Sequence, residues 1–456
     1  MELPETKDTI VAQATPPGAG ALAVIRVSGP GAFQAANSFL GPNRLRPRHR
    51  TASLLPVKDG NRLVDRAVAV FFRGPASYTG QDTVEITCHG SPYIIRTILN
   101  LAVRAGARPA RPGEFTLRAF LNGKLDLAQA EAVGELIKAG SAGAHLAALT
   151  QVEGALSKKV RAVKADLVAL LAELEARIDD SYEEIPHLEL KGFYARAEAA
   201  RQEALRLAEG FEAGRGIKEG ARIVITGAPN SGKSSLLNAL LGFDRALVSR
   251  ESGTTRDTLE AELELDGFSV LFTDTAGINA RPASPLELAG IARASEAIGR
   301  ADAVVLVLDG AIKETPSDRR AEREALKLAP GARLIRVVNK ADLPLKPGRQ
   351  KPGSFKVSAK TGEGLGRLKA ALIARQKKTF SDGAQAVVTS SRHFAALSAA
   401  ARELGALGPL LRRRDFPAEL AAERLRAALD SLAAILGETA PEEVLAGIFG
   451  SFCVGK

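Results

Sequence analysis

The segment GAPNSGKSS at residues 227–235 constrains the fold of this 456-residue chain more than any other feature. It follows the β-branched run RIVIT and precedes the run SSLLNALL, which is typical of a helix. A glycine-rich loop between a strand and a helix turns backbone N–H groups toward phosphate. Lys233 can neutralise the β and γ phosphates, and the Ser234 hydroxyl can bind Mg²⁺. The segment therefore predicts a phosphate-binding loop in an α/β domain.

Three later motifs complete a nucleotide site, and each of them follows an apolar run. DTAG at 274–277 offers Asp274 to the Mg²⁺ shell through water and the Gly277 N–H to the γ phosphate. NKAD at 339–342 offers the Asp342 carboxylate, which can accept two hydrogen bonds from the N1–H and amino edge of guanine. SAK at 358–360 completes the base pocket with backbone donors. Four motifs in this order favour GTP over ATP in a translation-factor-related GTPase fold.

The segment SRESGTTRD at 249–257 lies between the phosphate loop and DTAG, where a hydroxyl from Thr255 or Thr254 is expected on Mg²⁺. The predicted GTP contacts are Asn230, Ser231, Gly232, Lys233, Ser234, Ser235, Ser249, Arg250, Glu251, Ser252, Gly253, Thr254, Thr255, Asp274, Thr275, Ala276, Gly277, Asn339, Lys340, Ala341, Asp342, Ser358, Ala359 and Lys360. The predicted Mg²⁺ ligands are Ser234 and Thr255.

Hydrolysis needs an unusual device, because Ile278 follows DTAG where many GTPases carry a water-positioning glutamine. Asn230 can place its oxygen beside the phosphates and, with carbonyls from 249–254, form a cage for a monovalent cation. Two alternatives stay open. Asn230 can instead be a loop residue that tolerates a left-handed conformation, and Arg256 can act as a built-in arginine finger.

The segments on either side of the nucleotide motifs indicate two other kinds of structure. From Ile10 to about Leu121, short β-branched runs with glycine and proline between them predict an α+β domain. From Leu125 to about Phe211, and again from about Ala384, apolar residues recur at helical spacing. Between these helical stretches five apolar runs predict parallel strands, with one hairpin turning at Asp266 and Gly267. We expect an α/β domain inserted into a helical one, whose last helix begins at a capping box on Thr439.

Net charge, hydropathy and cysteine content indicate the kind of partner and the cellular compartment. A net charge of +10 favours polyanionic partners such as nucleic acid. No apolar run is long enough to cross a membrane, and the start MELPETKD is too polar for a signal peptide, so we expect a cytoplasmic protein without membrane contact. Cys88 and Cys453 have neither disulfide nor metal-ligand spacing. Cys88 is expected to be a structural strand residue.

Nearly the whole chain resembles the bacterial tRNA modification GTPases of the MnmE (TrmE) family. The resemblance is carried by DTIVAQATPPGAGALAVIRVSG, ARPGEFTLRAFLNGKLDLAQAEAV, the motifs GAPNSGKSSLLNAL, GTTRD and DTAG, and the final FCVGK. It implies a multidomain α+β and α/β protein with an amino-terminal tetrahydrofolate-binding and dimerising domain, a discontinuous helical domain and an inserted P-loop GTPase domain. The expected boundaries are 1–122, 123–218, 219–378 and 379–456, with the helical domain formed by the second and fourth segments.

The resemblance also implies a reaction. GTP hydrolysis would drive the addition of an aminomethyl or carboxymethylaminomethyl group to C5 of the wobble uridine of certain tRNAs. The expected partners are a second copy in a homodimer, the tRNA and a flavin-dependent protein of the MnmG (GidA) type, in a heterotetramer or larger complex. The added carbon would come from 5-formyl- or methylene-tetrahydrofolate.

Site residues carry over from the family one by one. The folate-binding positions match Arg26, Glu85, Lys124 and Lys456, and the potassium ligands match Asn230, Ser249, Glu251 and Thr254. Glu287 matches a catalytic glutamate that orients the attacking water, for which an ordinary helix-surface role is the alternative. Chemistry supports Glu85 independently, because a pterin presents the same amide and amine donors as guanine.

Cys453 belongs to the segment GSFCVGK, which we expect to leave the last helix flexibly and to reach the folate site near a dimer partner. The thiol would need a neighbouring base or cation to become a strong nucleophile, and its role stays open between covalent addition, acid–base assistance and shaping the site. Glu251 and Asn279 depart from the family pattern, which affects the expected switch geometry. A competing interpretation is an RNA-binding regulatory GTPase of ribosome assembly.

Overall fold

The computed structural model describes residues 7–41, 48–178, 189–242, 260–274, 299, 301–328, 332–382, 386–411 and 416–456. Contacts divide the chain into two compact units. The first unit is Met1–Gly134, Val152–Lys164 and Leu429–Lys456. The second is Glu135–Gln151 and Ala165–Ala428.

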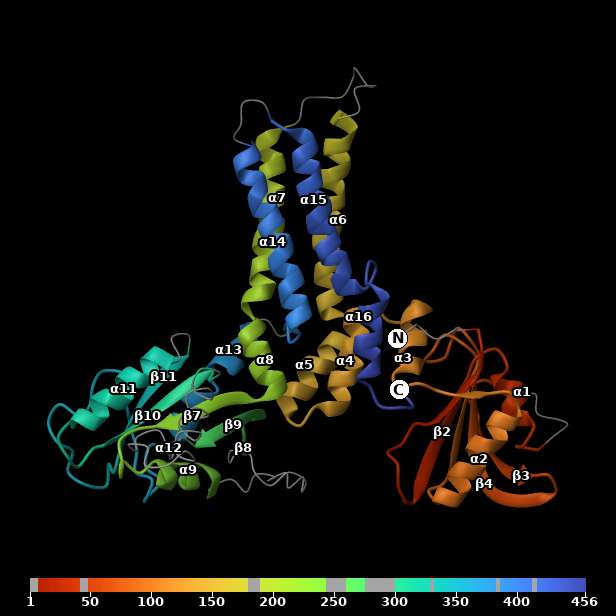
Figure 1. Cartoon of the computed structure of the whole chain (residues 1–456), viewed down its shortest axis with the longest axis horizontal. Helices are drawn as coiled ribbons and strands as arrows, with labels where there is room; N and C mark the ends of the chain where they lie inside the picture. The colour runs from red at the N-terminus through yellow and green to blue at the C-terminus, as the bar shows by residue number, and fades with distance from the viewer. Residues whose placement is uncertain are drawn as a thin grey trace, which may run out of the picture. The chain divides into compact units, whose positions relative to one another are not determined.

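The first unit contains a mixed sheet with the strand order β3-β4-β5-β2-β1-β6, in which only the β1–β6 pairing is parallel. Helices α1 and α2 lie against this sheet (Figure 1). The strands are β1 Ile10–Gln13, β2 Leu22–Ser28, β3 Ala52–Asp59, β4 Arg62–Phe72, β5 Thr83–His89 and β6 Arg108–Pro109. The helices are α1 Ala32–Asn37, α2 Pro92–Arg104 and α3 Glu114–Leu121.

Side chains along β2 alternate between an apolar face of the sheet, which α1 and α2 cover, and the opposite face, which carries Arg26. Ala23, Ile25 and Val27 are buried under α1 and α2, and Arg26 points to the opposite face because successive side chains alternate. The β2–β5 register places Arg26 directly opposite Glu85. Two residues 59 positions apart in the sequence therefore become cross-strand neighbours.

The helical stretches form at the positions that the apolar spacing predicts. Helices α6, α7, α14 and α15 bury their apolar stripes, and ion pairs at their surface, such as Arg196–Glu173 at 3.0 Å and Arg424–Glu403 at 2.8 Å, link neighbouring helices. Their association brings together two stretches of chain that the α/β insertion separates (Figure 1). The helices are α4 Leu127–Lys138, α5 Ala142–Val152, α6 Ala155–Ile178, α7 Leu190–Glu209, α8 Phe211–Glu219, α14 Ser391–Leu411, α15 Ala418–Leu436 and α16 Glu442–Gly450.

The inserted α/β region has the strand order β12-β11-β10-β7-β9-β8, and all its strand pairs are parallel except β8–β9. Its strands are β7 Ala221–Thr226, β8 Glu260–Leu265, β9 Phe268–Asp274, β10 Ala303–Asp309, β11 Arg333–Asn339 and β12 Phe355–Lys356. Its helices are α9 Lys233–Gly242, α11 Pro316–Leu328, α12 Leu365–Leu372 and α13 Ala374–Asp382. The predicted strands and the fold class are confirmed.

The predicted β8–β9 hairpin is also confirmed. Asp266 and Gly267 both have positive φ, at 47° and 85°, as a two-residue hairpin turn requires. The turn packs against the start of α5, where the Gly143 N–H donates to the Gly267 carbonyl at 2.7 Å. A Cβ at Gly143 would lie 2.8 Å from the Phe268 ring, so this approach requires glycine.

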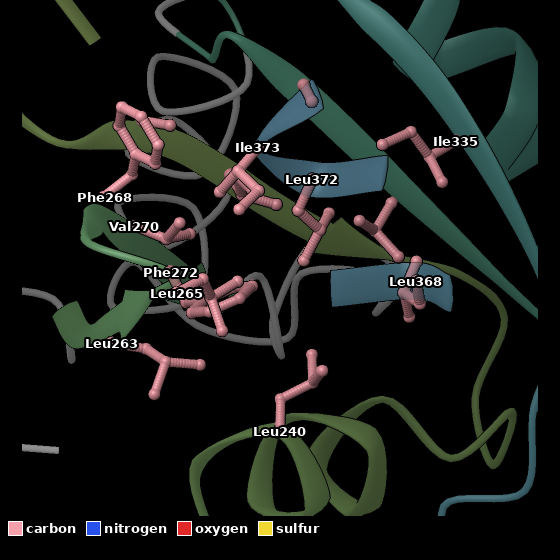
Figure 2. Packing of buried hydrophobic residues seen from close by; sticks show 14 of the residues in the cluster. Leu240, Leu263, Leu265, Phe268, Val270, Phe272, Ile335, Leu368, Leu372 and Ile373 are labelled. Carbon is pink, nitrogen blue, oxygen red and sulfur yellow. The ribbon is translucent and has the colours of Figure 1, made fainter. Parts of the chain in front are cut away.

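The core of the α/β region lies between its sheet and its helices. Figure 2 shows side chains from β8, β9 and β11 meeting Leu240 of α9 and Leu368 of α12. Every residue of β10 is buried, which explains why its sequence is a continuous apolar run instead of an alternating one. This core fixes the carboxyl ends of β7, β9 and β11, where the nucleotide motifs begin.

One predicted helix start is wrong. Helix α16 begins at Glu442 after Pro441, and no side-chain hydrogen bond caps it. Proline disfavours the helical conformation at the preceding residue, Ala440, so the helix begins after Pro441 instead of after Thr439. No helix in the described part of the chain is both long enough and apolar enough to span a membrane.

Candidate functional site

The phosphate loop lies between β7 and α9, where close packing requires its two glycines. A Cβ on Gly227 would lie 2.3 Å from the Val307 carbonyl oxygen. A Cβ on Gly232, which has a φ of +91°, would lie 2.3 Å from Asn339 Nδ2. Both positions exclude larger residues, because the loop passes directly against the backbone of β10 at Gly227 and against the buried Asn339 side chain at Gly232.

Polar groups of the loop are arranged around these glycines. Lys233 Nζ donates to the carbonyls of Gly227 at 3.2 Å and Ala228 at 3.1 Å, which holds the ammonium over the loop. Ser234 and Ser235 are exposed in the first turn of α9. Asn230 is exposed and has a φ of 59°, so the left-handed backbone expected in the alternative interpretation is present.

Asn339 connects the phosphate loop to the base-binding loops. It ends β11 and is 2% exposed. Its Nδ2 donates to the Ser231 carbonyl at 3.2 Å, and its Oδ1 accepts from the Ala359 N–H at 3.1 Å. A single buried amide therefore joins three of the four predicted motifs.

Asp342 is exposed at the position predicted for guanine recognition. The Ser358 hydroxyl donates to Asp342 Oδ1 at 2.6 Å, which orients the carboxylate. This hydrogen bond lowers the pKa of Asp342, and the positive charges of Lys360 and Lys340 lower it further. The carboxylate is therefore ionised and can accept two N–H donors at neutral pH. Ala341 donates its N–H to the Val357 carbonyl at 3.0 Å and so holds the two loops together.

The remaining nucleotide predictions fall on residues that the structure does not describe. These are Ser249, Arg250, Glu251, Ser252, Gly253, Thr254, Thr255, Thr275, Ala276, Gly277 and Glu287, together with the alternative finger Arg256. For Asp274 only the backbone is described, at the end of β9.

A second group of predicted residues meets on the outer face of the first unit's sheet. Arg26 donates to Glu85 Oε1 from Nε at 2.9 Å and from Nη2 at 2.7 Å. Its Nη1 donates to the Gly455 carbonyl at 3.3 Å. Burial lowers the pKa of Lys456, and the charge of Arg26 lowers it further, while Glu85 partly opposes both effects. The fold therefore brings Arg26, Glu85 and Lys456 together.

Lys124 lies apart from this group in its contacts. It is exposed just after α3, and its stem would touch a Cβ placed on Gly80 at 3.4 Å. Within the described residues no hydrogen bond or ion pair joins Lys124 to Arg26, Glu85 or Lys456.

The two cysteines differ as expected in their surroundings. Cys88 is buried in β5, where burial and the nearby charge of Asp65 raise its thiol pKa to about 11. Cys453 is exposed after α16. The expectation that GSFCVGK extends flexibly is wrong, because the segment is held beside Arg26 by backbone hydrogen bonds to its own chain at Gly113 and Phe115.

Comparisons with known proteins match the whole chain. A family profile described as "GTP-binding protein TrmE N-terminus" matches residues 9–124, and one described as "MnmE helical domain" matches residues 127–453. The tRNA modification GTPase MnmE of Thermus thermophilus is 43% identical over 460 residues, which cover 99% of both chains. The chain belongs to the MnmE family.

Other members of the MnmE family agree with this assignment. The protein of the same name from Akkermansia muciniphila is 40% identical, over 98% of this chain and 99% of its own.

Among solved structures, the G domain of the Thermotoga maritima FeoB iron transporter is 25% identical with a TM-score of 0.26, and the match covers 34% of this chain and 98% of that one.

Two aromatic side chains of this MnmE-family chain, which no sequence pattern marks as functional, lie beside Arg26. The Arg26 guanidinium carbon lies 5.4 Å from the Tyr78 ring centre and 5.5 Å from that of Phe115. Neither aromatic residue belongs to a motif with chemistry of its own. The one available signal is that Phe115 falls in the family-like segment ARPGEFTLRAF.

Proposed function

We propose that this chain hydrolyses GTP in its α/β region to drive the addition of an aminomethyl-type group to C5 of the wobble uridine of certain tRNAs. Membership of the MnmE family makes it a GTP hydrolase that acts in tRNA modification. The observation that carries the proposal is a full-length match at 43% identity to a tRNA modification GTPase. The joined phosphate and base loops at Asn339 and Asp342 support the nucleotide part of the proposal.

The exposed residues of the phosphate loop fit a Mg²⁺–GTP complex. Ser234 stands in the first turn of α9, where its hydroxyl would join Thr255 on Mg²⁺, with Asp274 acting through water. When bound, Mg²⁺ neutralises charge on the β and γ phosphates. Within the described residues no cluster of His, Cys, Asp and Glu forms a metal site.

The hydrolytic step would use a monovalent cation. Asn230 presents an exposed side chain from a left-handed position, and Ser249, Glu251 and Thr254 would complete a K⁺ site. When bound, K⁺ supplies positive charge beside the phosphates, as an arginine finger does in other GTPases. Glu287 would orient the attacking water.

The outer face of the first unit's sheet would bind 5-formyl- or methylene-tetrahydrofolate, which when bound supplies the one-carbon unit. Glu85 fits a pterin, because Oε1 holds Arg26 while Oε2 has no hydrogen-bond partner within the described part of the chain. Glu85 is 31% exposed, so its second oxygen can accept N–H donors. Lys124 would meet the carboxylates of the folate tail, Arg26 would support Glu85, and Lys456 would lie beside both Arg26 and Glu85.

The assembly would be a homodimer working with an MnmG (GidA)-type flavoprotein and tRNA in the cytoplasm. We propose domains at 1–122 and 219–378, with a helical domain formed by 123–218 and 379–456. The net charge of +10 supports an RNA partner.

Replacing Cys453 with serine tests the separation of the two activities. Cys453→Ser is expected to retain GTP turnover, because the thiol lies in the first unit and the nucleotide loops lie in the second, and to lose tRNA modification. Modification of wobble uridine in a reconstituted assay, measured by mass spectrometry, checks this. Full modification by the variant would contradict the role of Cys453. Absent modification by the unaltered chain, with normal GTP turnover, would favour a ribosome-assembly GTPase.

A further inference from the structure

We infer that Arg26 is a positioning residue that binds the Glu85 carboxylate and the Gly455 carbonyl together and so holds the segment 453–456, to which Cys453 belongs, and that the rings of Tyr78 and Phe115 fix its guanidinium. The consequence for tRNA modification rests on the proposed function. The contacts that carry the inference do not depend on it.

The hydrogen bonds of Arg26 divide between two parts of the chain that lie far apart in sequence. Nε and Nη2 donate to Glu85, and Nη1 donates to the Gly455 carbonyl, 429 positions away. The side chain is 13% exposed. A planar guanidinium can serve both directions at once because its donors are fixed in a fork, whereas a lysine ammonium is a single point.

Two aromatic rings position the Arg26 guanidinium. The guanidinium carbon lies within 5.5 Å of both ring centres, a distance typical of cation–π attraction. The Tyr78 hydroxyl pairs with Thr116 Oγ1 at 2.9 Å, and Thr116 follows Phe115 in α3. The two rings are therefore tied to each other as well as to Arg26. Tyr78 thus acts on Arg26 through its ring and on α3 through its hydroxyl.

The segment 453–456 is seated by its backbone. The Gly113 N–H donates to the Cys453 carbonyl at 3.4 Å, and the Phe115 N–H donates to the Lys456 carbonyl at 3.2 Å. Gly455 has a φ of +97°, and a Cβ there would lie 2.2 Å from the Gln13 carbonyl oxygen. Because the backbone makes these contacts, the Cys453 side chain stays exposed while the backbone that carries it is seated.

The same geometry links a ligand on Glu85 to the position of Cys453. Any group that draws Glu85 toward itself changes the Arg26 hydrogen bonds, and with them the bond to Gly455. Ligand binding and seating of the segment must then influence each other equally.

A spin label on Cys453 tests the inference without folate or tRNA. Cys88 is 1% exposed with a raised pKa, so a nitroxide reagent labels Cys453 selectively in the native protein. Electron paramagnetic resonance then reports the mobility of the label. In the unaltered chain the label on the exposed Cys453 side chain is expected to have its motion limited by the seated backbone, and an immobilised label means this restricted state.

A set of variants distinguishes the contributions of the Arg26 charge, the forked geometry of its guanidinium and the Tyr78 ring. Arg26→Lys keeps the charge and loses the fork, and it is expected to raise the undocked population about tenfold or more, as loss of a hydrogen bond to a charged group does. Gly455→Ala and Tyr78→Leu should mobilise the label as well. Tyr78→Phe keeps the ring and should leave the label immobilised. Arg104→Lys is the matched control, because Arg104 of α2 forms an exposed ion pair with Asp59 of β3, and this variant should leave the mobility of the label unchanged.

The outcomes are distinct for the inference and for the proposed function. An immobile label in Arg26→Lys, with a thermal unfolding profile like that of the unaltered chain, would overturn the inference. A label that is mobile in the unaltered chain would overturn it as well. Absence of 5-formyltetrahydrofolate binding in calorimetry would instead overturn the folate part of the proposed function and leave the mobility result intact.

Discussion

The proposed guanine recognition would depend on how the Ser358 hydroxyl orients the Asp342 carboxylate. Ser358 is fully buried and donates to one oxygen of Asp342, so the plane of the exposed carboxylate is fixed before nucleotide arrives. A carboxylate in this position accepts from both N–H groups of guanine. Asparagine has the same shape but only one acceptor, and its amide donor faces the guanine amino group.

Asp342→Asn is therefore expected to weaken GTP binding at least about tenfold, since a site built for hydrogen bonds discriminates strongly against an unmatched partner. The variant should bind xanthosine triphosphate better, because the 2-oxo group of xanthine accepts from the new amide. Calorimetry with both nucleotides measures this. Asp266→Asn, at the exposed hairpin turn, is the control. Equal GTP affinity in Asp342→Asn and the unaltered chain would contradict the assignment.

Helix α3 is fixed at its first turn by buried charges. Glu114 and Arg118 are 1% and 0% exposed, and their side chains are 2.9 Å apart. Arg108 joins Glu114 at 2.7 Å, and Asp8 pairs with both arginines. This cluster holds the turn whose N–H groups seat the segment 453–456.

The cluster predicts an acid-sensitive contribution to stability. Burial by itself raises the pKa of Glu114, but hydrogen bonds from Arg108, the Arg111 backbone and Arg118 outweigh burial and lower it. Because the folded pKa is below the unfolded value, the stabilisation is fully present above the unfolded pKa of about 4.3. It is lost as the pH falls through the lowered folded pKa.

Glu114→Gln is expected to lower the free energy of unfolding by about 1.5–3 kcal/mol at pH 7, because it removes a buried negative charge from Arg118 and leaves the partly exposed Asp8 as the counter-charge of both Arg108 and Arg118. Its deficit should shrink as the pH falls below about 4. Urea unfolding followed by a signal from the first unit measures both effects. Asp59→Asn, which breaks an exposed pair, should cost less than about 1 kcal/mol. A deficit independent of pH would contradict an ionised Glu114.

At the scale of the whole molecule, the proposed mechanism requires that the rate of GTP hydrolysis depend on which monovalent cation is present. Among the proposed potassium ligands, Asn230 lies in the described part of the chain. Its left-handed φ of 59° fits either a cation ligand or a simple loop residue, so a variant of Asn230 can distinguish the two interpretations. Glycine adopts the same backbone conformation without a side chain.

GTP turnover is expected to be roughly tenfold or more faster in KCl than in NaCl at equal ionic strength, as charge stabilisation at the transferred phosphoryl group requires. Asn230→Gly should abolish this preference while keeping the loop conformation. A phosphate-release assay in both salts gives the result. If Asn230→Gly keeps full potassium stimulation, the loop interpretation of Asn230 is correct.

The nucleotide motifs and most helices and strands were predictable because their signals are local. The hairpin turn at Asp266 and Gly267 needs positive φ at adjacent residues, and β10 needs a continuous apolar run. The start of α16 was also within reach, since Pro441 blocks the helix that a Thr439 cap would need.

The amino-acid sequence by itself predicted the glycine-rich loop between β7 and α9, the aspartate proposed to bind guanine, and the α+β, helical and α/β kinds of structure along the chain. In each case the required residues lie close together in the chain, so spacing alone expresses the chemistry. Only the tertiary structure decided which groups surround Arg26. Glu85, Tyr78 and the Gly455 carbonyl reach it from distant parts of the chain, and the last of these is a backbone atom that every residue carries. No pattern of side chains marks a backbone contact of that kind, because it arises from the folded path of the chain.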